Sequence, residues 1–187
     1  MSIPATLEHN LVRGHAITGV ALVIAGSVII ALAAQIAVPI PLTPVPLTLS
    51  PLAVLIVGVV LGARRGAAAA ILYLLEGLSG LPVGAQGHGG PLWLIGPTAG
   101  YLYAYPFAAF IAGWFSERGW GRSIPRAFVA MLIALAVIYA GGWSWLAMFA
   151  GPRAAFGMAI VPFVIADLVK IAIGAVLLPY AQRLVKV

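Results

Sequence analysis

Residues 166–175, Ala-Asp-Leu-Val-Lys-Ile-Ala-Ile-Gly-Ala, lie in the middle of the last long apolar run of this chain. They contain the only acid and the only base found deep inside any such run, Asp167 and Lys170. At a spacing of three residues, the two side chains share one helix face. Because charges in hydrocarbon are costly and mark functional positions, we interpret this face as part of a ligand pocket that the rest of the chain encloses.

The composition is that of an integral membrane protein. Of the 187 residues, 63% are hydrophobic and 7% are charged, and the mean hydropathy is +1.12. A soluble domain carries about 25% charged residues. No polar block is large enough for a second domain, so residues 1–187 are predicted to form a single transmembrane substrate-binding domain. Its expected location is the cell (cytoplasmic or inner) membrane, which it would cross several times.

The net charge of +6 does not indicate a nucleic-acid-binding protein, because of where the basic residues lie. Eight of the ten fall between or outside the apolar runs, in short segments that would share one side of the membrane: Arg13, Arg64, Arg65, Arg118, Arg122, Arg126, Arg183 and Lys186. This positive-inside pattern predicts that the N and C termini are cytoplasmic. The absence of cysteine excludes disulfides and thiolate metal ligands.

Six apolar runs predict an all-α bundle of six transmembrane helices. The runs cover residues 17–38, 52–61, 67–75, 97–115, 127–150 and 158–178. Arg64 and Arg65 would lie in a tight cytoplasmic turn between the second and third runs. The first run is interpreted as a retained helix, not a cleaved signal peptide, since it continues to Val38. Its small residues Ala21 and Ala25 would either dock a partner subunit or pack within the bundle.

Two extracytoplasmic loops are expected near the pocket. Residues 39–51 contain five prolines, which forbid a continuous helix, so this first loop is interpreted as a lid, with a plain connector as the alternative. Residues 77–100 contain eight glycines and are expected to lack regular structure. This third loop would offer backbone N–H groups and Gln86 to a ligand. It carries no phosphate-binding motif, and His88 has no partner for a metal. Glu76 would lie either at the membrane interface, which is preferred, or at the mouth of the pocket.

Aromatic residues near the outer helix ends would either line the pocket or anchor the helices at the membrane interface. Tyr101 lies four residues after Pro97 and is expected to face the glycine-rich loop, so it is preferred over Tyr103 and Tyr105 as a wall residue. Tyr139 and Trp143 stand four residues apart on one helix face, and both alternatives remain open for them.

Three interpretations are available for Asp167 and Lys170: a structural ion pair, a proton or ion path, and recognition of a small polar molecule. Only one acid is embedded, which argues against a path. Recognition is favoured, with Asp167 accepting ligand N–H groups and Lys170 donating to a carbonyl or carboxylate. No catalytic constellation, cofactor motif or nucleotide motif is present, so the chain is not expected to be an enzyme. Any ATP hydrolysis would belong to a partner chain.

Four segments, in order along the chain, resemble the motifs of the BioY family. They are residues 39–46 (PIPLTPVP), 80–83 (GLPV), 96–101 (GPTAGY) and 167–170 (DLVK). That family comprises the biotin-specific substrate-binding (S) components of energy-coupling-factor (ECF) transporters. The resemblance implies a six-helix bundle that holds biotin near its outer face. It also implies a transmembrane coupling subunit and cytoplasmic ATPases as partners.

Carried over to this chain, the resemblance implies contacts to biotin from the sixth helix, the glycine loop, the lid and one wall residue. These residues are Asp167, Lys170, Gln86, Gly89, Gly90, Thr43, Pro44, Val45 and Tyr101. The small-residue face at Ala21 and Ala25 would dock the coupling subunit. Biotin also fits chemically, because its ureido ring offers two N–H donors and a carbonyl, and Tyr139 and Trp143 suit its apolar part. An S component or small transporter for another vitamin, such as thiamin or riboflavin, is the alternative.

Overall fold

Glycines and prolines determine where the apolar runs become separate helices. The computed structural model describes residues 5–41 and 43–184, with side chains from 17 to 41 and from 43 to 178. Within these ranges there are seven α-helices: α1 (Ala5–Gln35), α2 (Ser50–Leu61), α3 (Ala63–Leu78), α4 (Ala99–Glu117), α5 (Ile124–Ala150), α6 (Pro152–Ala159) and α7 (Val164–Leu184). Three short 3-10 helices complete them: η1 (Ala85–Gly87), η2 (Pro91–Leu94) and η3 (Trp120–Arg122). The prediction of an essentially all-helical chain is confirmed.

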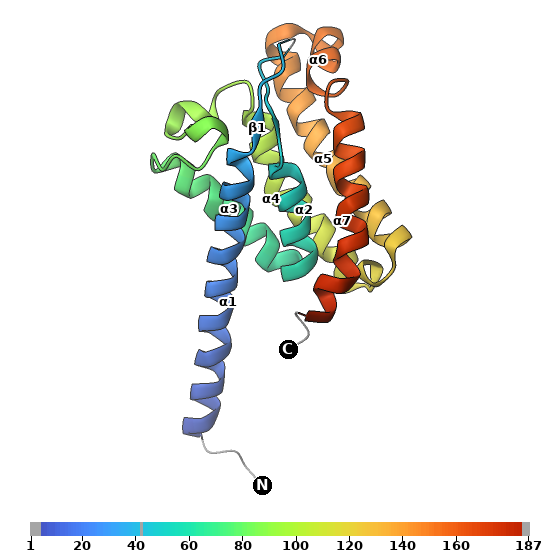
Figure 1. Cartoon of the computed structure of the whole chain (residues 1–187). Coiled ribbons are helices and arrows are strands. Elements are labelled where there is room, and N and C mark those ends of the chain that lie inside the picture. The colour runs from blue at the N-terminus through green and yellow to red at the C-terminus, as the bar shows by residue number, and fades with distance from the viewer. Residues whose placement is uncertain (1–4, 42, 185–187) are drawn as a thin grey trace.

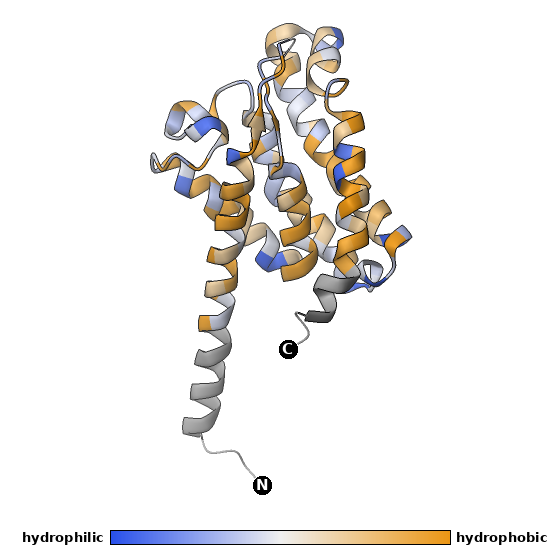
Figure 2. Ribbon diagram, viewed as in Figure 1, coloured by the Kyte–Doolittle hydropathy of each residue, from blue (hydrophilic) through white to orange (hydrophobic). Residues whose placement is uncertain are grey.

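Two helices are long and apolar enough to cross a bilayer by themselves, namely Ile17–Gln35 of α1 and the whole of α5. The helices α6 and α7 form a pair bent by 47° that would add a third crossing. Figure 2 shows hydrophobic residues along α1, α2 and α7, with hydrophilic positions interrupting α7. The expected single run over residues 158–178 is therefore wrong in detail. Residues 160–163 break it, where Pro162 has no N–H for a helical hydrogen bond.

Two further loop expectations need correction. Only Gly62 separates α2 from α3, so Arg64 and Arg65 lie in the first turn of α3 rather than in a loop. Gly62 has φ +84°, a backbone conformation that glycine adopts without strain. The segment 77–100 does contain regular structure, since η1 and η2 are single 3-10 turns within it.

Small residues let the central helix α4 approach its neighbours α2, α3 and α5 closely. A side chain at Gly100 would collide with the Gly141 backbone of α5, and one at Gly58 would collide with the Ala109 backbone. Backbones in contact at these positions fix the helix crossings without large side chains, as is common between membrane helices.

The described residues of the proline-rich loop are non-helical up to Leu49, as predicted, but Ser50 and Pro51 belong to α2. The chain on either side of the loop forms a minimal antiparallel ladder. The strands are β1 (Ala37–Val38) and β2 (Leu47–Thr48), with Ala37 opposite Thr48. This loop lies at the opposite end of the bundle from the start of α1 and the end of α7 (Figure 1). Leu42, Lys186 and the side chains of Arg13 and Arg183 lie outside the described parts of the chain.

Candidate functional site

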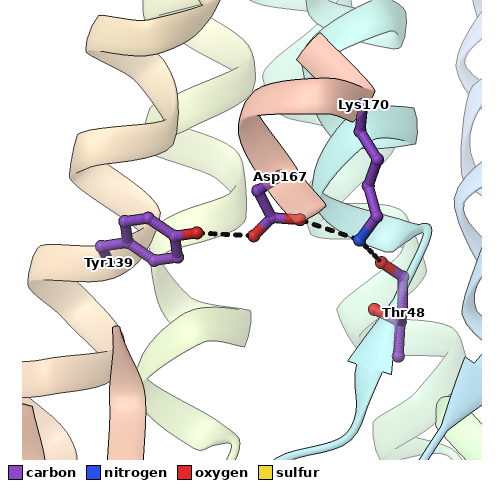
Figure 3. Close-up of polar contacts among 4 residues, drawn as sticks. All are labelled: Thr48, Tyr139, Asp167 and Lys170. Atoms are coloured by element: carbon purple, nitrogen blue, oxygen red, sulfur yellow. Dashed lines mark hydrogen bonds and ion pairs between the residues drawn. The ribbon is translucent and has the colours of Figure 1, made fainter. Parts of the chain in front are cut away.

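The carboxylate of Asp167 lies at the centre of a polar network in the first turn of α7. The residue is only 4% exposed. Its Oδ2 accepts a hydrogen bond from the Tyr139 hydroxyl of α5 at 2.7 Å, and its Oδ1 accepts one from Lys170 Nζ at 2.8 Å (Figure 3). Lys170 therefore neutralises an acid that burial alone would make costly to keep charged.

Lys170 connects this pair to the proline-rich loop. Its Nζ donates a second hydrogen bond, at 2.7 Å, to the backbone carbonyl oxygen of Thr48 in β2 (Figure 3). The network thus joins α5, α7 and the loop through three side chains. Any displacement of β2 away from α7 must break the bond between Lys170 and Thr48.

A cavity of about 60 Å³ lies beside Asp167, under the proline-rich loop. Its walls come from that loop, the glycine-rich segment and helices α2 to α5 and α7, with Phe163 just before α7. The lining residues are Val45, Pro46, Leu47, Thr48, Ser50, Pro51, Tyr73, Ala85, Trp93, Thr98, Tyr101, Leu102, Tyr105, Ile138, Tyr139, Phe163 and Asp167. Asp167 is the only charged residue among them. An apolar, aromatic cavity with one fixed carboxylate suits a small ligand that carries N–H donors.

Aromatic packing shapes the cavity wall that faces the glycine loop. Tyr73 and Trp93 meet edge to face with ring centroids 5.5 Å apart, and Tyr73 and Tyr105 stack at 6.4 Å. The Trp93 ring fills a slot where a side chain at Gly77 or Gly84 would collide with it. These contacts hold the Trp93 ring in one orientation.

Polar contacts also tie α1 to α3 and to the glycine loop. The Ser27 hydroxyl donates to Glu76 Oε1 at 2.8 Å, and Ser27 is fully buried. At the end of α1, the Gln35 amide donates to carbonyl oxygens of the loop, including Gly84 O at 3.0 Å. Glu76 thus packs against α1. Ala21 and Ala25 are exposed on α1.

Within the described residues, no group of three or more His, Asp or Glu side chains could hold a metal ion. The site can accept hydrogen bonds from a small ligand, but its described residues include no nucleophile paired with a base.

The sequence of this chain matches a known protein family. The family model of the BioY family matches residues 6–187 of the chain. This chain belongs to the BioY family. A probable biotin transporter BioY from Pyrococcus horikoshii is 40% identical over 154 residues, covering 81% of this chain and 86% of that protein. The biotin transporter BioY from Rhizobium etli is 38% identical over 151 residues, covering 75% and 76%.

A solved structure has the same fold as this BioY family member. It is the S-component for biotin from an ECF-type ABC transporter, with a TM-score of 0.80 over 100% of this chain and 96% of that chain. At 21% identity this likeness concerns the fold.

The structure brings some of the sequence-predicted residues of this BioY chain to the cavity and leaves others outside it. Asp167, Tyr101, Tyr139 and Val45 line it. Lys170 lies behind Asp167 and does not itself line the cavity.

The other predicted residues do not line this cavity. Pro44, Gln86 and Gly89 line a second hollow of about 430 Å³, which shares Pro46, Ala85, Trp93 and Thr98 with the first. Thr43 Oγ1 accepts a hydrogen bond from the Val45 N–H, which shapes the lid turn. Gly90 donates its N–H to the Gly77 carbonyl, and Trp143 Nε1 donates to the Pro152 carbonyl.

Sequence reasoning missed the wall residues Tyr73, Trp93 and Phe163, and it wrongly ranked Tyr105 below Tyr101. Helical periodicity would have found Tyr105, which lies four residues after Tyr101 on the same face of α4. Trp93 and Phe163 lie in segments between the α-helices and carry no comparable signal, and Tyr73 was not singled out within its helix α3.

Proposed function

We propose that this chain binds biotin and brings it across the cytoplasmic membrane as the substrate-specific subunit of an ECF-type transporter. One observation carries the proposal: the Asp167 carboxylate, held by one hydrogen bond to each oxygen, lies in the wall of an otherwise apolar, aromatic cavity. The relatives named above as biotin transporters and the shared fold support it. The chain would act as a transport subunit and not as an enzyme.

The N–H donors of biotin match the unoccupied acceptor sites of this carboxylate. A carboxylate has about four lone-pair sites, and Tyr139 and Lys170 occupy two of them. Two sites remain for the ureido N–H groups. The rings of Tyr101 and Tyr139 then face the apolar bicyclic body.

The lid must move to admit the ligand. The cavity of about 60 Å³ is well below the range of about 300–1,000 Å³ that small-molecule sites occupy. Moving β2 outward enlarges the cavity and takes the Thr48 carbonyl away from Lys170. The freed ammonium then donates to an oxygen of biotin, which is the contact expected for Lys170. Gln86, Gly89, Gly90 and residues 43–45 would contribute from the two loops, and Trp143 from the rim.

The proposed topology has six crossings with both termini in the cytoplasm. The helices α1 to α5 supply five crossings, and the bent pair α6–α7 supplies the sixth. The small-residue face of α1 at Ala21 and Ala25 would dock the coupling subunit, because small residues allow close helix approach. ATP would be hydrolysed by cytoplasmic partner subunits, and this chain would need no cofactor.

Equilibrium binding to the purified chain in detergent tests the proposal. We expect biotin to bind in the nanomolar range, and thiamin and riboflavin not to compete. Tight binding of one of those vitamins in place of biotin would support the alternative specificity. If the chain bound no vitamin while remaining folded, the proposed function would be wrong.

A further inference from the structure

Another hollow, lined by charged residues and distinct from the two described above, lies at the opposite end of the bundle from the proposed biotin cavity. Its volume is about 450 Å³, and it lies between the start of α3 and the last turns of α4. Its lining residues are Leu61, Ala63, Arg64, Arg65, Phe110, Trp114, Glu117 and Arg118. Nothing in the transport mechanism proposed above uses these side chains.

Among the described side chains, none of the three arginines of this hollow has an acidic partner. Among the side chains that the structure describes, the only ion pair within 4.0 Å is that of Lys170 with Asp167. Arg64 and Arg65 are exposed in the first turn of α3. Arg118 is held in place, since its guanidinium stacks 3.4 Å above the Trp114 ring and Nη1 donates to the Trp114 carbonyl at 3.1 Å.

The one acid of the hollow is committed to the backbone. Glu117 Oε1 accepts the N–H of Ala63, the first residue of α3, at 2.8 Å. Gly113 leaves no room for a side chain against Gly62 and Ala63, so the two helix ends are in direct contact. Three arginines and one glutamate leave two net positive charges around a rigid wall.

We propose that this hollow binds the phosphate of an anionic phospholipid headgroup. Guanidinium groups offer a planar fork of donors that matches phosphate oxygens. The exposed rings of Phe110 and Trp114, 43% and 38% exposed, continue the hollow as an apolar rim. Acyl chains can pack against that rim, whereas a free phosphate ion has no apolar surface to bury there. Basic pockets between helices on the cytoplasmic side are known headgroup sites, and this step rests on the proposed membrane topology.

Native mass spectrometry of the purified chain tests this proposal. The probes are phosphatidylglycerol, phosphatidylcholine with the same acyl chains, and inorganic phosphate. We expect one phosphatidylglycerol to be retained in preference to phosphatidylcholine, and excess inorganic phosphate not to displace it. Replacing the three arginines (R64Q, R65Q and R118Q together) should weaken phosphatidylglycerol binding by about tenfold or more.

A matched variant removes the same charge elsewhere, at the exposed residues Arg122, Arg126 and Arg153 (R122Q, R126Q and R153Q together). It should keep phosphatidylglycerol binding. Equal losses in both triple variants, or displacement by inorganic phosphate, would overturn the proposal. Unchanged phosphatidylglycerol binding in the R64Q, R65Q and R118Q variant would also overturn the proposal. The same holds if that variant loses its association with the coupling subunit but keeps the lipid.

Biotin binding serves as an independent readout in this experiment. Unchanged biotin affinity in the R64Q, R65Q and R118Q variant reports an intact fold, so a lipid effect there cannot be ascribed to unfolding. If this variant does not fold, R118Q alone replaces it, with a smaller expected loss of phosphatidylglycerol binding. Failure of biotin binding in the unaltered chain would count against the proposed function and leave the lipid result to be judged separately.

Discussion

At the scale of single residues, Asp167 would connect folding to ligand recognition under the proposed function. Its two oxygens each accept one hydrogen bond, from Tyr139 and from Lys170. Removing one partner of such a buried, hydrogen-bonded charge pair destabilises the fold strongly, whereas the intact pair adds little net stability. The pair is therefore better explained by the ligand that it prepares to bind than by the stability that it adds.

Replacing Asp167 by Asn keeps the shape of the side chain and removes its charge. The ureido N–H groups lose a charged acceptor, and an amide NH₂ can face them with the wrong polarity. We expect biotin affinity to fall by about thirtyfold or more, measured by equilibrium titration. Glu117→Gln is the control, since it makes the same chemical change at the opposite end of the bundle. A D167N chain with normal affinity would remove Asp167 from the proposed site.

The Tyr139 hydroxyl orients this carboxylate from α5. Tyr139→Phe removes the bond to Asp167 Oδ2 and should lower biotin affinity by about tenfold, because hydrogen bonds to charged groups are worth about 1.5–3 kcal/mol. Tyr103→Phe is the matched control. That hydroxyl donates to the Leu94 carbonyl outside the cavity, so affinity should stay unchanged. Equal losses in both variants would argue for a general effect on folding.

Lys170 separates the structural role of the ion pair from its role in binding. Lys170→Met leaves Asp167 buried without its countercharge, which should cost about 3–5 kcal/mol of unfolding free energy and lower Tm clearly. The double variant D167N/K170M removes both charges and should recover most of that stability. It should still not bind biotin. Normal biotin binding by the double variant would show that the pair only holds helices together.

At the scale of elements, the sequence predicts helices better than it predicts their ends. The helix within residues 17–38 and the proline-rich loop could be predicted directly, because hydropathy and proline act locally. Their ends could not, since α1 stops at Gln35, Ala37–Val38 form β1 and α2 begins at Ser50. The split of the last run into α6 and α7 could not, although Pro162 marks it. A proline within an apolar run kinks a helix or ends it, depending on the packing around it. The single-residue turn at Gly62 was missed for a similar reason.

The candidate site shows the same division between local and long-range signals. Asp167 and Tyr139 could be singled out, because a charge in an apolar run and an aromatic face are visible in the sequence. Trp93 could not, since its place depends on the glycine loop folding back over α3. Its slot exists only because Gly77 and Gly84 come together in space.

That slot gives a prediction about the glycine loop. Gly77→Ala places a methyl group where the Trp93 ring now lies, so the ring must shift. Overpacking of this kind costs about 1–3 kcal/mol, so we expect a lower Tm and weaker biotin binding. Gly157→Ala in α6 is the control, because nothing lies within 4 Å of the new methyl group. A G77A chain that matched G157A in Tm and affinity would show that the Trp93 ring is not confined.

At the scale of the whole molecule, α1 occupies a distinctive position. In the most apolar stretch of α1, 22% of the residues are buried inside the protein, compared with 33% in the corresponding stretch of α5. It nevertheless bonds to α3 through Ser27 and to the glycine loop through Gln35, and it continues directly into β1 of the lid. A partner bound to the exposed face of α1 would therefore be mechanically connected to both loops that cover the cavity beside Asp167.

This arrangement predicts a separation between binding and transport. Replacing Ala21 and Ala25 by leucine fills the small-residue face of α1, which blocks close approach by another helix. Both alanines are exposed, so the double variant should fold and bind biotin normally. It should fail to co-purify with a co-expressed coupling subunit. The leucine pair at Ala136 and Ala140, exposed at the same spacing on α5, should leave that association intact. Equal loss in both pairs would move the docking surface away from α1.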